Sequence, residues 1–150
     1  MMGEYKYTGG CQCGAVRYGF SSEPRDPHIC HCRMCQKAFG NFFAPFLGVK
    51  IADLTWTRGA PAYFRSSDVT ERGFCPACGT PLTFHYLNTD RISLSLGSLD
   101  RPAEVKPGKQ YGIEARMPWF AELAGLPGTR TDDDLPADME IHSLQHPDHD

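Results

Sequence analysis

The clearest pattern of apolar and polar positions lies at residues 91–96, where the two kinds of residue alternate. Ile92, Leu94 and Leu96 would lie on one face of a strand, and the polar residues between them on the other. Such alternation is typical of a strand with one face in the core. We therefore predict a half-buried strand over residues 91–96.

Short aromatic or β-branched runs separated by turn residues recur along the chain. They predict further strands at residues 42–47, 51–57, 62–65 and 80–86, and a hairpin over residues 4–20 that turns at residues 9–14. Residues 21–27 read as a polar loop with two prolines. A helical segment at residues 33–39 ends at Gly40, and a second short helix is expected at residues 117–123, with Pro118 near its start. These elements indicate a mostly β fold of packed antiparallel sheets with one or two short helices.

The length of 150 residues is that of one domain. We place this domain at residues 1–126. The remaining residues, 127–150, are rich in Thr, Asp, Pro and His and are expected to form an extended polar tail.

The composition indicates a thin aliphatic core. Only 20 residues are Val, Ile or Leu, whereas 15 are Gly and 12 are Pro. The net charge of −3 argues against a general nucleic-acid binder. No apolar run approaches the ~20 residues of a membrane span, so we expect no membrane partner.

All seven cysteines lie between positions 11 and 78. An odd number of cysteines cannot pair completely in disulfides, and the first eight residues contain no apolar stretch of a signal peptide. We therefore expect a cytoplasmic protein, in which clustered thiols are metal ligands or catalytic groups.

Four of the cysteines form two close pairs, Cys11-x-Cys13 and Cys75-x-x-Cys78. Pairs of cysteines on tight turns are the usual building blocks of a closed tetrahedral zinc site. The spacing thus predicts one structural zinc ion bound by all four thiolates. A core with few aliphatic residues gains the most stability from such a bound metal ion. The alternative is that these are small buried residues that fill the core.

The other three, Cys30, Cys32 and Cys35, lie within six residues. Three thiolates leave one zinc position open, as in catalytic zinc sites. The segment therefore predicts a second zinc ion at a catalytic site. Three alternatives stay open: a redox pair of Cys32 and Cys35, a site completed by His28, or simple buried thiols.

Three motifs together resemble one known family. Gly9-Gly10-Cys11-Gln12-Cys13-Gly14, Cys30-His31-Cys32-Arg33-Met34-Cys35 and Phe74-Cys75-Pro76-Ala77-Cys78-Gly79 look like the motifs of the glutathione-dependent formaldehyde-activating enzymes, a family that also contains centromere protein V. Their order, spacing and flanking residues match those of the family. The resemblance implies a β-rich fold around a structural zinc ion, with a second zinc ion on the three clustered cysteines.

The resemblance also implies a carbon–sulfur lyase that joins formaldehyde and glutathione or cleaves their adduct. The expected ligand is a small-molecule thiol or aldehyde adduct. Centromere protein V shows that the fold also serves another role, so a non-catalytic, zinc-stabilised binding module with only the structural zinc filled is the alternative.

Three further residues are candidates for the reaction. His31 would point away from the metal in an extended segment. It could support the metal ligands, contact the substrate or donate a proton to the aldehyde oxygen, and the alternative is an ordinary exposed or packed histidine. Arg33 and Lys37 could bind the two carboxylates of a glutathione-like thiol. As charges on a short helix, the same two residues could also be ordinary solvated surface.

Overall fold

The structure, a computed structural model, describes residues 4–149 and contains two β-sheets. The smaller sheet has the strand order β1-β2-β5, formed by Tyr7–Gly10, Arg17–Phe20 and Thr55–Arg58. The larger sheet has the order β10-β3-β4-β9-β8-β7-β6, formed by Lys109–Tyr111, Arg25–Cys30, Ala44–Lys50, Arg91–Ser95, Pro81–Tyr86, Thr70–Phe74 and Ala62–Arg65. Neighbouring strands are antiparallel except for β10 and β3, which are parallel.

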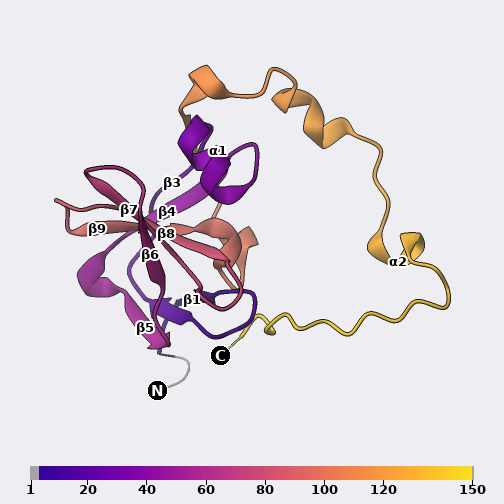
Figure 1. Ribbon diagram of the computed structural model, residues 1–150, viewed down its shortest axis with the longest axis horizontal. Helices are drawn as coiled ribbons and strands as arrows, with labels where there is room; N and C mark the ends of the chain where they lie inside the picture. The colour runs from indigo at the N-terminus through magenta and orange to yellow at the C-terminus, as the bar shows by residue number, and fades with distance from the viewer. Residues whose placement is uncertain (1–3, 150) are drawn as a thin grey trace.

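The helices are short (Figure 1). They comprise α1 and α2 and five 3₁₀ turns: α1 Arg33–Phe39, α2 Thr131–Asp134, η1 Ile51–Asp53, η2 Leu96–Ser98, η3 Pro102–Glu104, η4 Ile113–Ala115 and η5 Phe120–Gly125. The predicted mostly β fold with packed sheets and short helices is confirmed. Across residues 4–149 no helix has the length and apolar content needed to cross a membrane.

Several predicted elements are confirmed closely. Helix α1 occupies residues 33–39 and ends at Gly40, whose left-handed backbone and N–H bonds to the Gln36 and Lys37 carbonyls form the expected cap. Strand β9 shows the predicted burial of Ile92 and Leu94, but Ser95, which was expected on the polar face, is buried as well. Three strands were not predicted: β3, which begins near the end of the expected loop at residues 21–27, and the polar strands β7 and β10. The second expected helix is a 3₁₀ turn, η5, shifted a few residues along the chain.

The main core lies between the two sheets. Its largest fully buried residues come from β2, β4, β8 and β9 and include Tyr18, Phe20, Leu47, Leu82 and Leu94. Strand β4 alternates between two environments: Leu47 and Val49 face this core, while Ala44 and Phe46 belong to a second, smaller apolar cluster with Cys35 of α1. The larger sheet is thus covered by the smaller sheet on one face and by α1 on the other.

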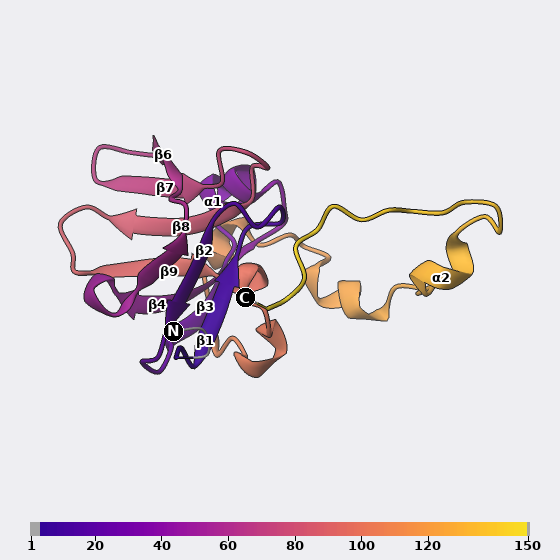
Figure 2. The ribbon, with the colours of Figure 1, turned by 90° about the horizontal axis from the view of Figure 1, so that it is seen from below.

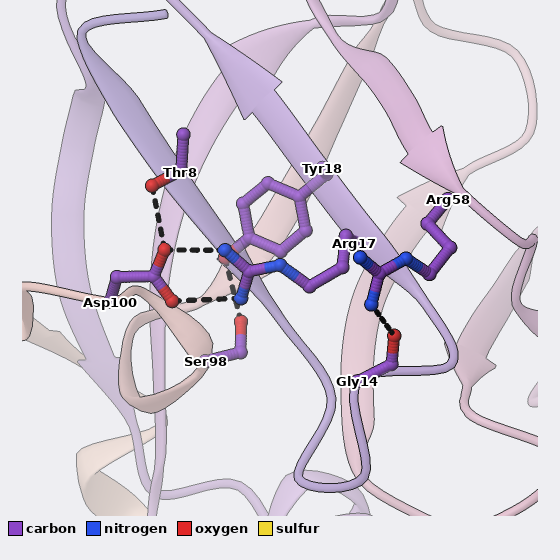
Figure 3. A network of polar contacts seen from close by, with 7 residues as sticks. All are labelled: Thr8, Gly14, Arg17, Tyr18, Arg58, Ser98 and Asp100. Atoms are coloured by element: carbon purple, nitrogen blue, oxygen red, sulfur yellow. Dashed lines mark hydrogen bonds and ion pairs between the residues drawn. The ribbon is translucent and has the colours of Figure 1, made fainter. Parts of the chain in front are cut away.

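A buried ion pair joins the two sheets (Figure 3). Both guanidinium nitrogens of Arg17 donate to the Asp100 carboxylate, at 2.8 and 2.6 Å, and the Thr8 hydroxyl donates to it at 2.6 Å. Beside this pair, the hydroxyls of Tyr18 and Ser98 lie 2.8 Å apart. Because Asp100 follows η2 and Arg17 lies on β2, the network fixes the small sheet against the end of the large one.

The last part of the chain leaves the sheets and comes back to them. Figures 1 and 2 both show the orange-to-yellow segment describing a wide arc that ends beside β1. The backbone N–H of His146 donates to the Gln12 carbonyl at 2.7 Å, and this bond closes the arc. Most side chains from residue 127 onward are exposed. The boundary at residue 126 stays a prediction.

Candidate functional site

Four cysteines meet where two turns approach each other. Cys11 and Cys13 lie between β1 and β2, and Cys75 and Cys78 lie between β7 and β8; we call them the cysteine quartet. Their sulfur atoms all lie within 4.8 Å of one another, with 3.6 Å between Cys11 and Cys13 and 3.8 Å between Cys13 and Cys75. Thiolates around a tetrahedral zinc ion are about 3.8 Å apart, given a Zn–S distance of about 2.3 Å. The quartet can hold a metal ion, and its donors and spacing fit zinc.

Two thiols of the quartet differ in how readily they ionise. Despite a hydrogen bond with the Ala15 backbone, burial and the neighbouring thiols raise the pKa of Cys13 to about 11. The N–H of Val16 donates to the Cys11 sulfur at 3.2 Å, and the N–H of Cys78 donates to the Cys75 sulfur at 3.4 Å. Burial opposes ionisation of Cys78, but hydrogen bonds from Thr80 outweigh it and lower the pKa of this thiol to about 6. A thiol that ionises readily is ready to bind a metal ion at neutral pH.

The other three cysteines lie on the opposite face of the large sheet; we call them the cysteine triplet. Cys30 ends β3, Cys32 caps the N-terminus of α1, and Cys35 lies in its first turn. The N–H of Cys35 donates to the Cys32 sulfur at 3.4 Å, and the three sulfurs lie within 4.8 Å of one another. The triplet can therefore also hold a metal ion, and three sulfurs leave one tetrahedral position for another ligand.

The triplet faces a cavity of about 640 Å³. The walls are mainly apolar and include a few polar groups, which is the usual make-up of a small-molecule site. Its lining residues include the three cysteines, Arg72, His28, Met34, Phe46, Phe84, Tyr86 and Tyr111. The cavity beside the quartet is smaller, about 230 Å³. The triplet is thus the cysteine group with room for a substrate.

Arg72, on β7, was not singled out from the sequence. It is only 8% exposed, and its Nη2 donates to the Cys35 sulfur at 3.4 Å. Burial raises the pKa of the Cys35 thiol to about 12, and the Arg72 guanidinium opposes this shift. The only hint in the sequence was an arginine two residues before the Phe74-Cys75 motif. Only the pairing of β7 with β8 reveals that it reaches the triplet.

His31 lies between two members of the triplet but is completely buried. Its Nε2 donates to the Gln110 side-chain oxygen at 2.8 Å, and its ring packs edge-on against Phe120, with centroids 4.7 Å apart. It is not among the residues that line the cavity in the described part of the chain. Of the alternatives that the sequence left open, this geometry favours a packed histidine with a positioning role over one that contacts the substrate.

The remaining candidates lie at different distances from the triplet. His28 lines the cavity, and its Nδ1 donates to the Asp26 carbonyl at 2.7 Å. The group of ligand atoms within 4.8 Å of one another contains the three sulfurs and, within residues 4–149, no histidine nitrogen. Arg33 and Lys37 are exposed on α1, outside the cavity wall as far as residues 4–149 define it. Arg33 donates to the Gln36 side chain at 3.3 Å.

The sequence matches a family model described as glutathione-dependent formaldehyde-activating enzyme, over residues 6–114. This match covers both cysteine groups, and it agrees with the resemblance seen in the three motifs.

Two similar proteins accompany this match, and the solved structure supports the fold. A protein of Schizosaccharomyces pombe named as an uncharacterized lyase is 31% identical over 83 residues, 55% of this chain and 60% of that protein. The match thus spans less than two thirds of that relative's length. A crystal structure of a Rhodobacter sphaeroides protein has a TM-score of 0.55 and 21% identity, and the match covers 69% of this chain and 98% of that one.

Proposed function

Because the chain belongs to the glutathione-dependent formaldehyde-activating enzyme family, we propose that it is a carbon–sulfur lyase that forms or cleaves a thiol–aldehyde adduct at the cysteine triplet. The observation that carries this proposal is the three-sulfur group facing a cavity of about 640 Å³. A closed structural site needs no such space. The name of the yeast relative, a lyase, is consistent with the same reaction class.

We assign zinc to both cysteine groups, one structural ion on the quartet and a second on the triplet. Zinc on the triplet would supply Lewis acidity and an open position that stabilises a thiol as thiolate at neutral pH. In the adduct-forming direction a sulfur–carbon bond forms, the carbonyl π electrons move to oxygen, and the proton given up by the thiol ends on that oxygen. Cleavage is the reverse. Free thiols at all seven cysteines suit a reducing compartment such as the cytoplasm.

The residues around the triplet hold the reactants and limit access of water. The rings of Phe46, Phe84 and Tyr86 line the wall and give it low polarity. The backbone N–H of His31 donates to the Tyr111 carbonyl at 2.9 Å, which fixes the segment between Cys30 and Cys32 against β10. We therefore assign His31 the task of holding the triplet in place.

Arg33 and Lys37 keep their proposed role at the outer end of a longer substrate. Both are cations on the helix that carries Cys35, so they can meet the two carboxylates of a glutathione-like thiol that extends out of the cavity. Replacing both with glutamine is expected to raise KM for such a thiol and leave kcat unchanged. A fall in kcat alone would contradict this role.

Turnover of S-hydroxymethylglutathione tests the proposal. Because the uncatalysed exchange is itself fast, the rate is best followed by NMR exchange spectroscopy, with a protein-free sample as control. The exchange rate with wild type is expected to exceed the protein-free rate. The rate with Cys32→Ser is expected to equal the protein-free rate. Equal rates for both proteins would overturn the assignment for this substrate.

Metal analysis separates the enzyme from the binding module. About two zinc ions per chain would support the enzyme, whereas one zinc ion with three titratable thiols would favour the non-catalytic module. A loss of two thiols on mild oxidation that is reversed by reduction would point instead to a redox pair of Cys32 and Cys35.

A further inference from the structure

Arg72 is buried beside the triplet with one donor unused. Its Nε donates to the Ser66 hydroxyl at 3.1 Å and its Nη2 to the Cys35 sulfur at 3.4 Å, and its guanidinium carbon lies 4.7 Å from the centre of the Phe84 ring. Its Nη1 is shielded from solvent and has no hydrogen-bond partner in the described residues. The guanidinium is thus held on three sides, with the NH₂ group at Nη1 left for a ligand.

The charge of Arg72 needs a counter-charge, because a buried and unpaired cation is strongly destabilising. The contacts of its side chain in residues 4–149 are a hydroxyl, a ring and a sulfur, with no carboxylate. The sulfurs of the triplet would supply this counter-charge once a metal ion has deprotonated them. Loading three neutral thiols with a divalent ion releases three protons and gives a sum of −1, and a bound thiolate substrate makes the sum −2. A cation at this place favours both the binding of the metal ion and the binding of the thiolate substrate, since each makes the site more negative.

The unused Nη1 points to the chemistry of the ligand. A buried N–H without an acceptor is costly, and the cost ends when a ligand in the cavity supplies an oxygen. Arg72 lines the same cavity as the three sulfurs, so a ligand bound there through sulfur would bring its neighbouring atoms close to the guanidinium. His31, which the sequence suggested as the donor to oxygen, does not line this cavity in the described residues.

We propose that Arg72 is a catalytic residue with two tasks: it balances the negative charge of the metal-loaded triplet, and it donates a hydrogen bond from Nη1 to the oxygen of the adduct. This inference rests on the proposed function and names the residue that recognises the oxygen. When sulfur adds to the carbonyl carbon, the π electrons move to oxygen, and Nη1–H stabilises the negative charge that develops there. Arginine keeps its own proton, because a guanidinium is not deprotonated in proteins. The proton of the thiol reaches the oxygen through solvent.

Cobalt(II) binding tests the first task without any turnover. The probe is the sulfur-to-cobalt absorption band, measured in competition with a chelator, in wild type, Arg72→Gln, Arg72→Lys and the control Arg65→Gln. Arg65 is exposed on β6 and donates to the Asp68 carbonyl. We expect Arg72→Gln to bind the second cobalt equivalent about tenfold more weakly, which corresponds to about 1.4 kcal/mol of binding free energy. In Arg72→Gln, the affinity for the first cobalt equivalent should stay close to that of wild type. Arg72→Lys and Arg65→Gln should bind both equivalents about as tightly as wild type.

The second task is tested by the choice between two thiols. Mercaptoacetate carries oxygen acceptors next to its thiol and ethanethiol carries none, and both can be titrated into the cobalt-loaded protein. Wild type is expected to prefer mercaptoacetate by about tenfold or more, because a site built to donate a hydrogen bond discriminates against a ligand without an acceptor. Arg72→Lys keeps the charge but lacks the planar fork of donors, so it should lose most of this preference.

The outcomes separate the inference from the function on which it rests. Unchanged cobalt affinity in Arg72→Gln would overturn the charge-balancing task, and an unchanged thiol preference in Arg72→Lys would overturn the donor task. If Arg72→Gln does not fold, Arg72→Lys alone decides the second task, and its cobalt affinity decides whether a charge at this position suffices. Wild type that binds no cobalt at the triplet would overturn both the proposed function and this inference.

Discussion

Two buried arginines show how a single residue acquires its role from its counter-charge. Arg17 faces the carboxylate of Asp100 in a network that joins the sheets, whereas Arg72 faces the sulfur of Cys35 at the cavity. Both were invisible as special residues in the sequence, because their partners are 83 and 37 residues away. The cysteines, by contrast, were identified from short-range spacing. A metal ligand set built from close pairs is visible in a sequence, but a pair of distant residues is not.

Removing the partner of Arg17 should destabilise the fold strongly. Asp100→Asn leaves a buried guanidinium without its counter-charge, and we expect a loss of about 3–5 kcal/mol in the free energy of unfolding. The control is Glu104→Gln, which breaks the exposed pair of Arg101 and Glu104, with 3.2 Å between its charged atoms, and should cost about 1 kcal/mol or less. Urea unfolding measures both. Similar losses in the two variants would contradict the importance given to the buried pair.

The same pair predicts how stability depends on pH. Burial disfavours the charged form of Asp100, but hydrogen bonds from Arg17 and Thr8 outweigh it and hold the pKa of this carboxyl below its ordinary value of 3.8. Because the folded pKa is the lower one, the contribution to stability is complete above the unfolded pKa and is lost as the pH falls through the folded pKa.

Urea unfolding of wild type and Asp100→Asn between pH 6 and pH 3 checks this expectation. The difference in unfolding free energy should be constant at the upper end and shrink as the pH falls below about 4, the ordinary pKa of an aspartate. A difference that stays constant over the whole range would be the wrong result.

At the scale of elements, strands with a buried apolar face were predicted and strands held mainly by their neighbours were not. Alternating apolar and polar residues predicted β9, and the glycine cap predicted the end of α1. Strand β3 contains Pro27 and mostly polar residues, and β10 has three exposed residues, so neither carries an apolar period. These two strands pair with each other, and together they carry Cys30 to its place at the cavity. Strand β3, which places Cys30, was therefore not visible in the sequence pattern, whereas α1, which carries Cys35, was predicted.

The turn after β10 limits where Cys32 can lie. Gly112 has φ +64°, and a Cβ added there would meet the Cys32 nitrogen at 2.6 Å. Gly40, at the other end of α1, has φ +59° and no atoms within 4 Å of such a Cβ. Gly112→Ala should therefore displace Cys32, whereas Gly40→Ala should add only the left-handed strain of about 1–2 kcal/mol.

Cobalt binding distinguishes the two alanine variants. We expect Gly112→Ala to lose the absorption band of the second cobalt equivalent and Gly40→Ala to keep it, with the first equivalent present in both. Loss of the band in both variants would show that backbone strain near α1, and not the contact with Cys32, disturbs the triplet.

At the scale of the whole molecule, the two cysteine groups serve different parts of the fold. The quartet draws two of its sulfurs from the small sheet's hairpin and two from a turn of the large sheet. The triplet belongs to one continuous segment between β3 and α1. A metal ion on the quartet thus links distant parts of the chain, whereas a metal ion on the triplet links only neighbours.

This difference predicts opposite effects on stability. Cys78→Ser should lower the melting temperature by ten degrees or more, since the binding free energy of a structural metal is part of the folding free energy. Cys32→Ser should change it by only a few degrees and abolish activity. Thermal melting with and without a chelator measures the effect. Equal melting temperatures in the two variants would contradict the division into a structural and a functional group.

The C-terminal segment gives a test of the proposed domain boundary. Its exposed residues and single turn of helix, α2, contribute little buried surface. A chain that ends at residue 126 is expected to keep both metal ions and melt within a few degrees of the full chain. Loss of either metal ion would extend the folded unit into the segment that returns to Gln12.

The quartet joins residues that are far apart in the sequence, and this separation also affects the rate of folding. Cys13 and Cys75 are 62 residues apart, and Arg17 and Asp100 are 83 apart, so the chain must close large loops before either contact forms. The entropy of closing such loops slows folding in proteins dominated by distant contacts. Zinc that binds the four thiols in the unfolded chain would close the loop between Cys13 and Cys75 before the strands pair. We therefore expect refolding to be faster when zinc is present from the start than when it is added later, so that the four sulfurs govern the rate at which the sheets meet as well as their final arrangement.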